Sequence, residues 1–291
     1  MTLIKAFAQG ARLITLPAVG VPVLMATVWA FYHRGVFDKN LFIFTLLSGG
    51  FIQCAVNFFN DVLDFKKGVD QEGRKGPPRL TAQERFSQKQ VMSFGFISLF
   101  LACIIALPLI ISGGWPILAL GLVSCLLTYL YSGSSFAMAD KGASELFVIL
   151  FFGLGAVGGT YYIQTLEWDS SLIYLGLQCG FWALSILLVN YLRDEKEDRS
   201  AGRKNLVTLY GREWGLLGLA VTQLLIYLFC FYWLDTHPKA GALSFCTLPL
   251  SAVLIYFIAV TPPSPLYNRY LFFMSLLYSL FGIAWIAGFV L

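Results

Sequence analysis

Charged side chains are scarce in this sequence: Asp, Glu, Lys and Arg together make up 12% of the 291 residues, against roughly 25% in soluble globular proteins. Histidine occurs only twice, so a histidine-based catalytic centre or a zinc site has few ligands to use. The six cysteines are far apart in sequence and include no Cys-x-x-Cys pair, which indicates packing residues. These shortages argue against an ordinary soluble domain and against a zinc enzyme.

What the chain has instead is long apolar segments. Hydrophobic residues make up 58% of it, and the mean hydropathy is +0.73. Several charge-free runs reach the length of about 20 residues that a transmembrane helix needs. The longest run, residues 90–139, must hold two spans because Ser112-Gly113-Gly114-Trp115-Pro116 is a turn-forming cluster near its middle.

The sequence therefore predicts an all-α polytopic membrane protein, with residues 1–291 forming a single transmembrane domain of nine helices. The expected helices are residues 13–32, 41–64, 90–111, 116–133, 144–165, 171–193, 214–234, 242–260 and 270–290.

The basic residues predict the orientation of these spans. With nine spans, 17 of the 20 Lys and Arg fall on the side of the N-terminus, and an excess of basic residues marks cytoplasmic loops. We therefore expect the N-terminus and the loops 65–89 and 194–213 to be cytoplasmic and the C-terminus to be outside. Twelve of the 16 acids fall on the same side.

Two amides and two carboxylates share one face at the cytoplasmic end of the second predicted helix. At 100° per residue they fall within an arc of about 100°. Gly68 can end this helix and let a further acid fold back toward the face. The residues of this first stripe are Asn57, Asn60, Asp61, Asp64 and, beyond the helix, Asp70.

A second stripe stands at the end of the sixth predicted helix, on the same side of the membrane. Asn190, Asp194 and Asp198 follow one another at intervals of four residues. Ionisable groups at the membrane are costly and therefore mark functional sites. The two stripes are four spans apart, so they could meet across the bundle.

The chemistry of these residues indicates a magnesium-bound diphosphate. Crowded carboxylates repel one another unless a cation joins them, and oxygen ligands without Cys or His suit Mg²⁺, which commonly bridges carboxylates and substrate phosphates. Basic side chains near the stripes could bind the remaining phosphate oxygens. They are Lys67, Arg74, Arg79, Arg193, Arg199, Arg203 and Lys204. The tail of such a ligand would lie in the lipid.

The motif order Asn60-Asp61-x-x-Asp64, then Asn190-x-x-Arg193-Asp194-x-x-x-Asp198-x-x-x-Gly202, resembles the UbiA superfamily of intramembrane prenyltransferases over essentially the whole chain. Within it, the chain most resembles the 1,4-dihydroxy-2-naphthoate polyprenyltransferases of menaquinone synthesis. The supporting features are Asn57, Lys67-Gly68-x-Asp70, Gly76-Pro77-Pro78-Arg79, Tyr131-Ser132-Gly133 and Gly142-x-x-Glu145. Gly68 stands where ubiquinone-branch members usually have a third acid, which favours the naphthoate branch.

The resemblance implies a UbiA-type bundle with a cytoplasmic active site, in a bacterial inner membrane, that uses two Mg²⁺ ions. Its substrates would be an allylic polyprenyl diphosphate and 1,4-dihydroxy-2-naphthoate, which loses CO₂; nucleic acid is not an expected partner.

The resemblance also implies roles for individual residues. It implies that Asp61, Asp64, Asp194 and Asp198 are catalytic and bind metal with Asn57, Asn60, Asp70 and Asn190. It implies diphosphate binding by Lys67, Arg79, Arg193, Arg199, Lys204 and Tyr131. Aromatic side chains that could shield a carbocation are Phe58, Phe59, Tyr129, Tyr131, Tyr161, Tyr162 and Tyr191.

Three alternatives remain open from the sequence. The acceptor could be another aromatic compound, such as 4-hydroxybenzoate or homogentisate. A cation-coupled secondary transporter also uses intramembrane carboxylates, but usually near the membrane midplane. A lipid phosphotransferase or phosphatase could use the same metal and acids.

Overall fold

The computed structural model describes residues 7, 9–12, 15–68, 75–76, 79–83, 86–132 and 142–291. Every regular element in these residues is helical. The elements are α2 (Pro17–Arg34), α3 (Lys39–Lys66), α4 (Gln88–Ser132), α5 (Ser144–Val148), the π-helix η3 (Ile149–Gly155), α6 (Ala156–Thr165), α7 (Ser171–Arg193), α8 (Glu195–Ser200), α9 (Leu206–Tyr210), α10 (Arg212–Thr236), α11 (Pro238–Phe245), α12 (Leu248–Val260) and α13 (Tyr267–Val290).

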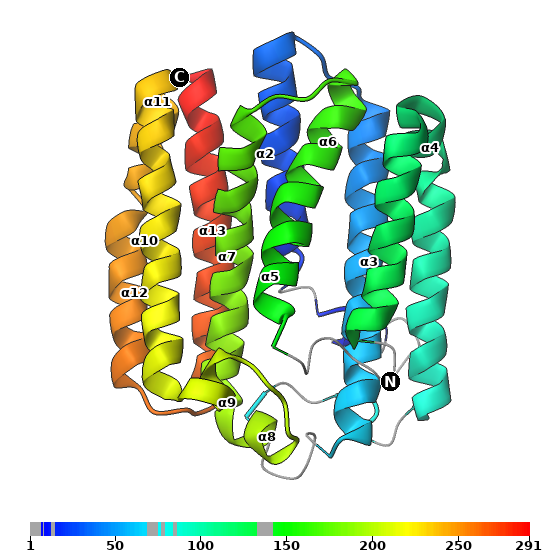
Figure 1. The fold of residues 1–291 in the computed structure, drawn as a ribbon, viewed down its shortest axis with the longest axis vertical. Coiled ribbons are helices and arrows are strands. Elements are labelled where there is room, and N and C mark those ends of the chain that lie inside the picture. Colours follow the sequence, from blue (N-terminus) through cyan, green and yellow to red (C-terminus); the bar gives the residue numbers. More distant parts are fainter. Residues whose placement is uncertain are drawn as a thin grey trace.

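The long helices stand side by side along the long axis of the molecule (Figure 1). The short helices α8 and α9 lie at one end of this bundle, beside the C-terminal ends of α3 and α7, and the C-terminus of the chain lies at the other end (Figure 1). Seven helical stretches in the described residues are long and apolar enough to cross a membrane. They are α3, α4, α5 to α6, α7, α10, α11 to α12, and α13.

Helix α4 contains the break that the sequence predicts within residues 112–116. Its 45 residues would span ~67 Å as a straight helix, about twice the thickness of a hydrocarbon core. Gly114 interrupts it with φ 65° and ψ −153°, a conformation that glycine adopts readily because it has no Cβ. The chain reverses there, and the two halves of α4 run antiparallel (Figure 1).

The main apolar core lies among α2, α7, α10 and α13. Its largest fully buried side chains include Trp182, Trp233 and Trp285. Gln178 is a paired polar residue of this core: its side-chain amide donates to the Ile226 carbonyl at 2.9 Å and accepts from the Trp233 indole at 2.7 Å. This pairing is favourable because lipid offers no alternative partner for a buried polar group.

The π-helix η3 packs unusually close to α7 through glycine. A Cβ atom placed on Gly153 would lie 2.3 Å from the carbonyl oxygen of Gly176 and 2.8 Å from the Cα of Gly180. Only a residue without a side chain permits this approach, which is the usual reason for small residues at helix contacts in membranes. The contact fixes the position of η3 against α7.

Candidate active site

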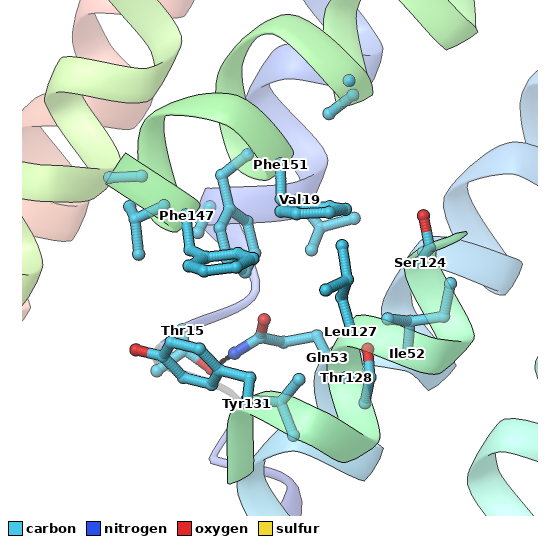
Figure 2. Close-up of a pocket in the computed structure, with 18 of the residues that line it drawn as sticks. Thr15, Val19, Ile52, Gln53, Ser124, Leu127, Thr128, Tyr131, Phe147 and Phe151 are labelled. Carbon is cyan, nitrogen blue, oxygen red and sulfur yellow. Dashed lines mark hydrogen bonds between the residues drawn. The ribbon is translucent and has the colours of Figure 1, made fainter. Parts of the chain in front are cut away.

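A cavity of about 440 Å³ lies between α2, α3, α4, α7 and the α5–η3–α6 helix. Its lining on α3 runs from Thr45 to Asp64, a length of ~28 Å along the helix. Polar side chains line the end nearest α8, and aliphatic and aromatic side chains line most of the remainder. Figure 2 shows Phe147 and Phe151 on one wall, Leu127 and Tyr131 on another, and Gln53 between them.

Three members of the first predicted stripe line this cavity. Asn57, Asn60 and Asp64 lie on successive turns of α3 and all face the cavity. The Asn57 side-chain nitrogen donates to the Ala11 carbonyl at 2.8 Å and to the Thr15 hydroxyl at 3.2 Å. These bonds join the face of α3 to the segment that precedes α2.

Asp61 does not line the cavity, although the sequence places it in the same stripe. The residue is 2% exposed, and its carboxylate accepts from the backbone amides of Leu80 at 2.9 Å and Thr81 at 3.2 Å. The Thr81 hydroxyl donates to the same carboxylate. Asp61 therefore faces the loop that carries Arg79, and not the cavity.

All three members of the second stripe line the cavity. Helix α7 ends at Arg193, and Asp194 joins it to α8 with φ −97° and ψ 16°. The Asp198 amide still donates to the Asp194 carbonyl at 2.8 Å, so the four-residue spacing keeps Asn190, Asp194 and Asp198 on one side. The helix boundary between them does not disrupt the predicted stripe.

Arg203 joins the two stripes. Its guanidinium donates to Asp64 on α3 and, at 3.2 Å, to Asp198 on α8. The other oxygen of Asp64 accepts from Arg79. Burial, and then the neighbouring Arg12 guanidinium, lowers the pKa of Arg203 to about 10, so it keeps its positive charge at neutral pH. The sequence indicated that the two stripes could meet, and in the structure one carboxylate of each stripe, Asp64 and Asp198, binds the same guanidinium.

Asp194 is held by a second arginine. Arg193 donates two hydrogen bonds of 2.6 Å to the Asp194 carboxylate and one of 2.8 Å to the Asn268 side-chain oxygen. Asn268 in turn donates to the Lys75 carbonyl at 2.8 Å. A chain of polar contacts thus connects α13, the end of α7 and the segment after α3.

Asn205 binds one carboxylate oxygen of Asp198, and Arg203 binds the other. The Asn205 side-chain nitrogen donates to Asp198 at 2.9 Å, and its oxygen accepts from the Val207 and Thr208 amides, which caps α9. The Leu206 amide donates to Glu145 at 3.2 Å. These contacts fix the turn that contains Arg203.

The predicted diphosphate-binding residues separate into two groups. Arg79, Arg193 and Tyr131 line the cavity, whereas Lys67, Arg199 and Lys204 are not part of its lining. The Arg199 side chain is 57% exposed and pairs with Glu195. Asp70 and Arg74 lie outside the described residues.

Several polar lining residues were not predicted as site residues: Arg12, Thr15, Gln53 and Asn205. Arg12 stands directly before the first apolar run, and a charge at a membrane edge is a signal that could have identified it. Gln53 lies one turn before Asn57 on the same face of α3, so extending the stripe toward the N-terminus would have found it. Nothing in the spacing singled out Asn205.

Two of the seven aromatic candidates, Tyr131 and Tyr191, line the cavity. Phe58 and Phe59 are fully buried elsewhere: Phe58 packs on Phe7 and Phe94, and Phe59 packs on Phe96 and Tyr129. Phe147, Phe151 and Phe152 were not among the candidates, but they line the cavity from the α5–η3 segment.

The donor set of this site fits Mg²⁺. Every candidate ligand at the polar end is an amide or carboxylate oxygen, the type that this ion prefers. Within the described part of the chain, no three Asp, Glu, His or Cys side chains cluster closely enough to hold a metal by themselves. Amide oxygens and substrate phosphate oxygens would therefore have to complete the coordination, as is usual for this ion.

Comparison with known proteins shows which family the chain resembles. The profile of the UbiA prenyltransferase family matches residues 19–286. The chain is 31% identical to a 1,4-dihydroxy-2-naphthoate octaprenyltransferase of Bacillus subtilis over 74% of this chain and 68% of that one. It is 33% identical to an enzyme of the same description from Mycobacterium leprae, over 70% of each chain.

Among solved structures, the fold is similar to a UbiA homologue from Archaeoglobus fulgidus that is described as bound to GPP and Mg²⁺. The TM-score is 0.67 at 16% identity, with 98% of this chain and 100% of that chain covered. At this identity the similarity shows a common fold.

Proposed function

The chain belongs to the UbiA prenyltransferase family, and from that premise we propose that it transfers a polyprenyl group from an allylic polyprenyl diphosphate to 1,4-dihydroxy-2-naphthoate. The reaction would depend on Mg²⁺ and release diphosphate and CO₂. The observation that carries this proposal is the meeting of two amide-and-carboxylate stripes, through Arg203, at the end of a long apolar cavity.

The oxygens of Asn60, Asp64, Asn190, Asp194 and Asp198 would hold the metal, since all five residues line the polar end of the cavity. When bound, Mg²⁺ would neutralise charge that develops on the departing diphosphate. Asn57 lines the same face, but its side-chain nitrogen is bonded to the segment before α2. The role of Asn57 would therefore be to hold the segment before α2 through its side-chain nitrogen, and its side-chain oxygen would be left for the metal.

Arginine side chains would bind the diphosphate. Arg79, Arg193 and Arg203 are buried or half-buried at the cavity and already donate to carboxylates there. Charged donors fixed in advance stabilise a leaving group without reorganisation. Tyr131 could add a hydroxyl donor from α4. The exposed positions of Arg199 and Lys204 make them weaker candidates than Arg203.

The apolar part of the cavity would take the polyprenyl chain and exclude water from the allylic carbon. Water is a competing nucleophile for a carbocation, so a dry wall protects the reaction. Tyr131, Tyr191 and Phe147 line the cavity beside the polar end, and their ring faces would attract the developing positive charge.

The acceptor assignment is supported by the descriptions of the relatives, which name 1,4-dihydroxy-2-naphthoate octaprenyltransferases. Another aromatic acceptor is the nearest alternative. A cation-coupled transporter is disfavoured because the carboxylates lie at one end of the cavity, near α8, and not at its middle.

We also propose that residues 1–291 form one domain that crosses a bacterial inner membrane nine times. The seven apolar stretches become nine if α4 crosses twice around Gly114 and α2 crosses once. The excess of basic residues would place α8, α9 and the polar end of the cavity in the cytoplasm and the C-terminus outside.

A panel of acceptors tests the function. Purified protein would be given an allylic polyprenyl diphosphate and 1,4-dihydroxy-2-naphthoate, 4-hydroxybenzoate or homogentisate, with Mg²⁺ or with EDTA. We expect release of diphosphate and CO₂ and formation of the hydroquinone demethylmenaquinol with the naphthoate and Mg²⁺ only. Turnover of another acceptor in its place would move the protein to a different branch, and full activity in EDTA would exclude the metal site.

A further inference from the structure

We propose that Asp61 is a positioning residue whose carboxylate fixes the loop of residues 79–83 and thereby holds Arg79 against Asp64. The inference rests on the proposed function only for the ligand that Arg79 would bind. It gives Asp61 a role different from the metal-binding one that the sequence motif suggests.

The Asp61 carboxylate accepts three hydrogen bonds from the loop. Its two oxygens accept from the Leu80 amide at 2.9 Å and the Thr81 amide at 3.2 Å. The Thr81 hydroxyl donates to the carboxylate as well and lies 3.3 Å from the Asp61 carbonyl. Two adjacent backbone amides and one hydroxyl thus converge on one buried anion, and hydrogen bonds to a charged acceptor are about twice as strong as neutral ones.

Apolar packing presses the same loop onto α3. Leu80 is fully buried in a small cluster with Ala11, Phe58 and Val62. Phe58 and Val62 flank Asp61 on α3, so the polar and apolar contacts of the loop are made with the same two turns of helix. Loop residues held in this way have little freedom to move relative to α3.

The contacts of Asp61 with Leu80 and Thr81 are called the clamp from here on. Arg79 directly precedes Leu80, so the clamp acts on Arg79 through a single peptide unit. The Arg79 side chain is 7% exposed, lines the cavity and donates to Asp64. Arginine has many rotamers, and ordering it costs conformational entropy. The fixed backbone at Leu80 and Thr81 places Arg79 where Asp64 can order its side chain before any substrate binds, and preorganised groups increase affinity.

Geometry separates Asp61 from the proposed metal ligands. Asn60 and Asp64 line the cavity, whereas Asp61 is not part of its lining and both of its oxygens face loop amides. A metal in the cavity could reach Asp61 only if the side chain turned away from the loop, which would break buried hydrogen bonds at considerable cost.

Two substitutions and one matched control test the clamp. Asp61→Asn removes the charge and one acceptor, and Thr81→Val removes the hydroxyl while keeping the side-chain shape. Thr81→Ser keeps the hydroxyl and serves as the control. Hydrogen exchange of the Leu80 and Thr81 amides would be measured in metal-free, substrate-free protein. We expect exchange in Asp61→Asn to be faster by about tenfold or more, since a protecting hydrogen bond to a charged group is lost.

Steady-state kinetics then separate positioning from metal binding. We expect Asp61→Asn and Thr81→Val to raise the KM for the allylic diphosphate by about tenfold, with the Mg²⁺ concentration for half-maximal activity unchanged within about twofold. Thr81→Ser should resemble the wild type. Asp64→Asn should instead raise the Mg²⁺ requirement.

Unchanged amide exchange in Asp61→Asn would overturn the clamp, and a Mg²⁺ requirement raised as in Asp64→Asn would show that Asp61 is a ligand. These results are distinguishable from failure of the proposed function. If wild-type protein turned over none of the acceptors, the function would be wrong, while the exchange measurement would still decide whether Asp61 holds the loop.

Discussion

Arg203 donates a hydrogen bond to Asp64, although the two residues are 139 positions apart in the chain. The same guanidinium also donates to Asp198 at 3.2 Å. The cation therefore lies between the carboxylates of the two stripes and compensates a repulsion that would otherwise raise their free energy.

Replacing Arg203 by alanine should destabilise the metal-free protein. Asp64 and Asp198 would each lose a charged donor in a buried site, at a cost of about 1.5–3 kcal/mol for a hydrogen bond of this kind. The measurement is the apparent melting temperature in detergent. Arg199→Ala is the matched control, because the exposed pair of Arg199 with Glu195 should contribute about 0–1 kcal/mol. Equal melting temperatures for the two variants would show that Arg203 does not stabilise the fold.

Replacing Asp194 by asparagine should reduce kcat by about 10²- to 10³-fold, the range seen when one preorganised electrostatic group is lost. Asp194 lines the cavity and is fixed by two hydrogen bonds from Arg193. The neighbouring change Glu195→Gln should leave kcat within about twofold, since Glu195 pairs with the exposed Arg199. A similar kcat for both variants would contradict the two-stripe site.

Replacing Asn268 by leucine should weaken diphosphate binding. Asn268 connects Arg193 to the Lys75 carbonyl through hydrogen bonds of 2.8 Å each, so its loss leaves the Arg193 guanidinium less fixed. We expect the KM for the allylic diphosphate to rise by about tenfold, and a double-mutant cycle with Arg193→Lys to give a coupling energy of about 1 kcal/mol or more. Strict additivity of the two changes would show that Asn268 does not act through Arg193.

Replacing Gly153 by alanine should destabilise the wall of the cavity. The new Cβ would lie 2.3 Å from the Gly176 carbonyl oxygen, and relieving this overlap should cost about 1–3 kcal/mol. Gly50→Ala is the control, because a Cβ there has no heavy atom within 4 Å and alanine favours a helix by up to about 1 kcal/mol. The apparent melting temperature should fall for Gly153→Ala and stay level or rise for Gly50→Ala. A level value for Gly153→Ala would contradict close packing of η3 on α7.

Much of the fold follows from local properties of the sequence. The length of the apolar runs places α3, α7, α10 and α13 within a few residues of their observed ends, because a segment without charges gains by crossing the membrane as a helix. The break at Gly114 also follows from its turn-forming neighbours. The seven residues of η3 have no such local signal, since their π-helical form accompanies close packing on α7.

The candidate site follows from the sequence only in part. The helical period brings Asn57, Asn60 and Asp64 to one face, and they do line the cavity. The same period includes Asp61, because angular position on a helix does not reveal which neighbour covers that face. Tertiary contacts decided that the loop of residues 79–83 covers Asp61.

By itself, the sequence determined that the chain is helical and membrane-spanning, and that its acids and amides gather in two stripes at one end of the bundle. Those properties depend on hydrophobicity and helical spacing, which act between near neighbours in the chain. Only the tertiary structure decided that Arg203 joins Asp64 to Asp198, that Arg199 points to the surface, and that Asp61 faces a loop. These arrangements depend on which surfaces meet when the helices pack, and spacing along one helix carries no information about its partners.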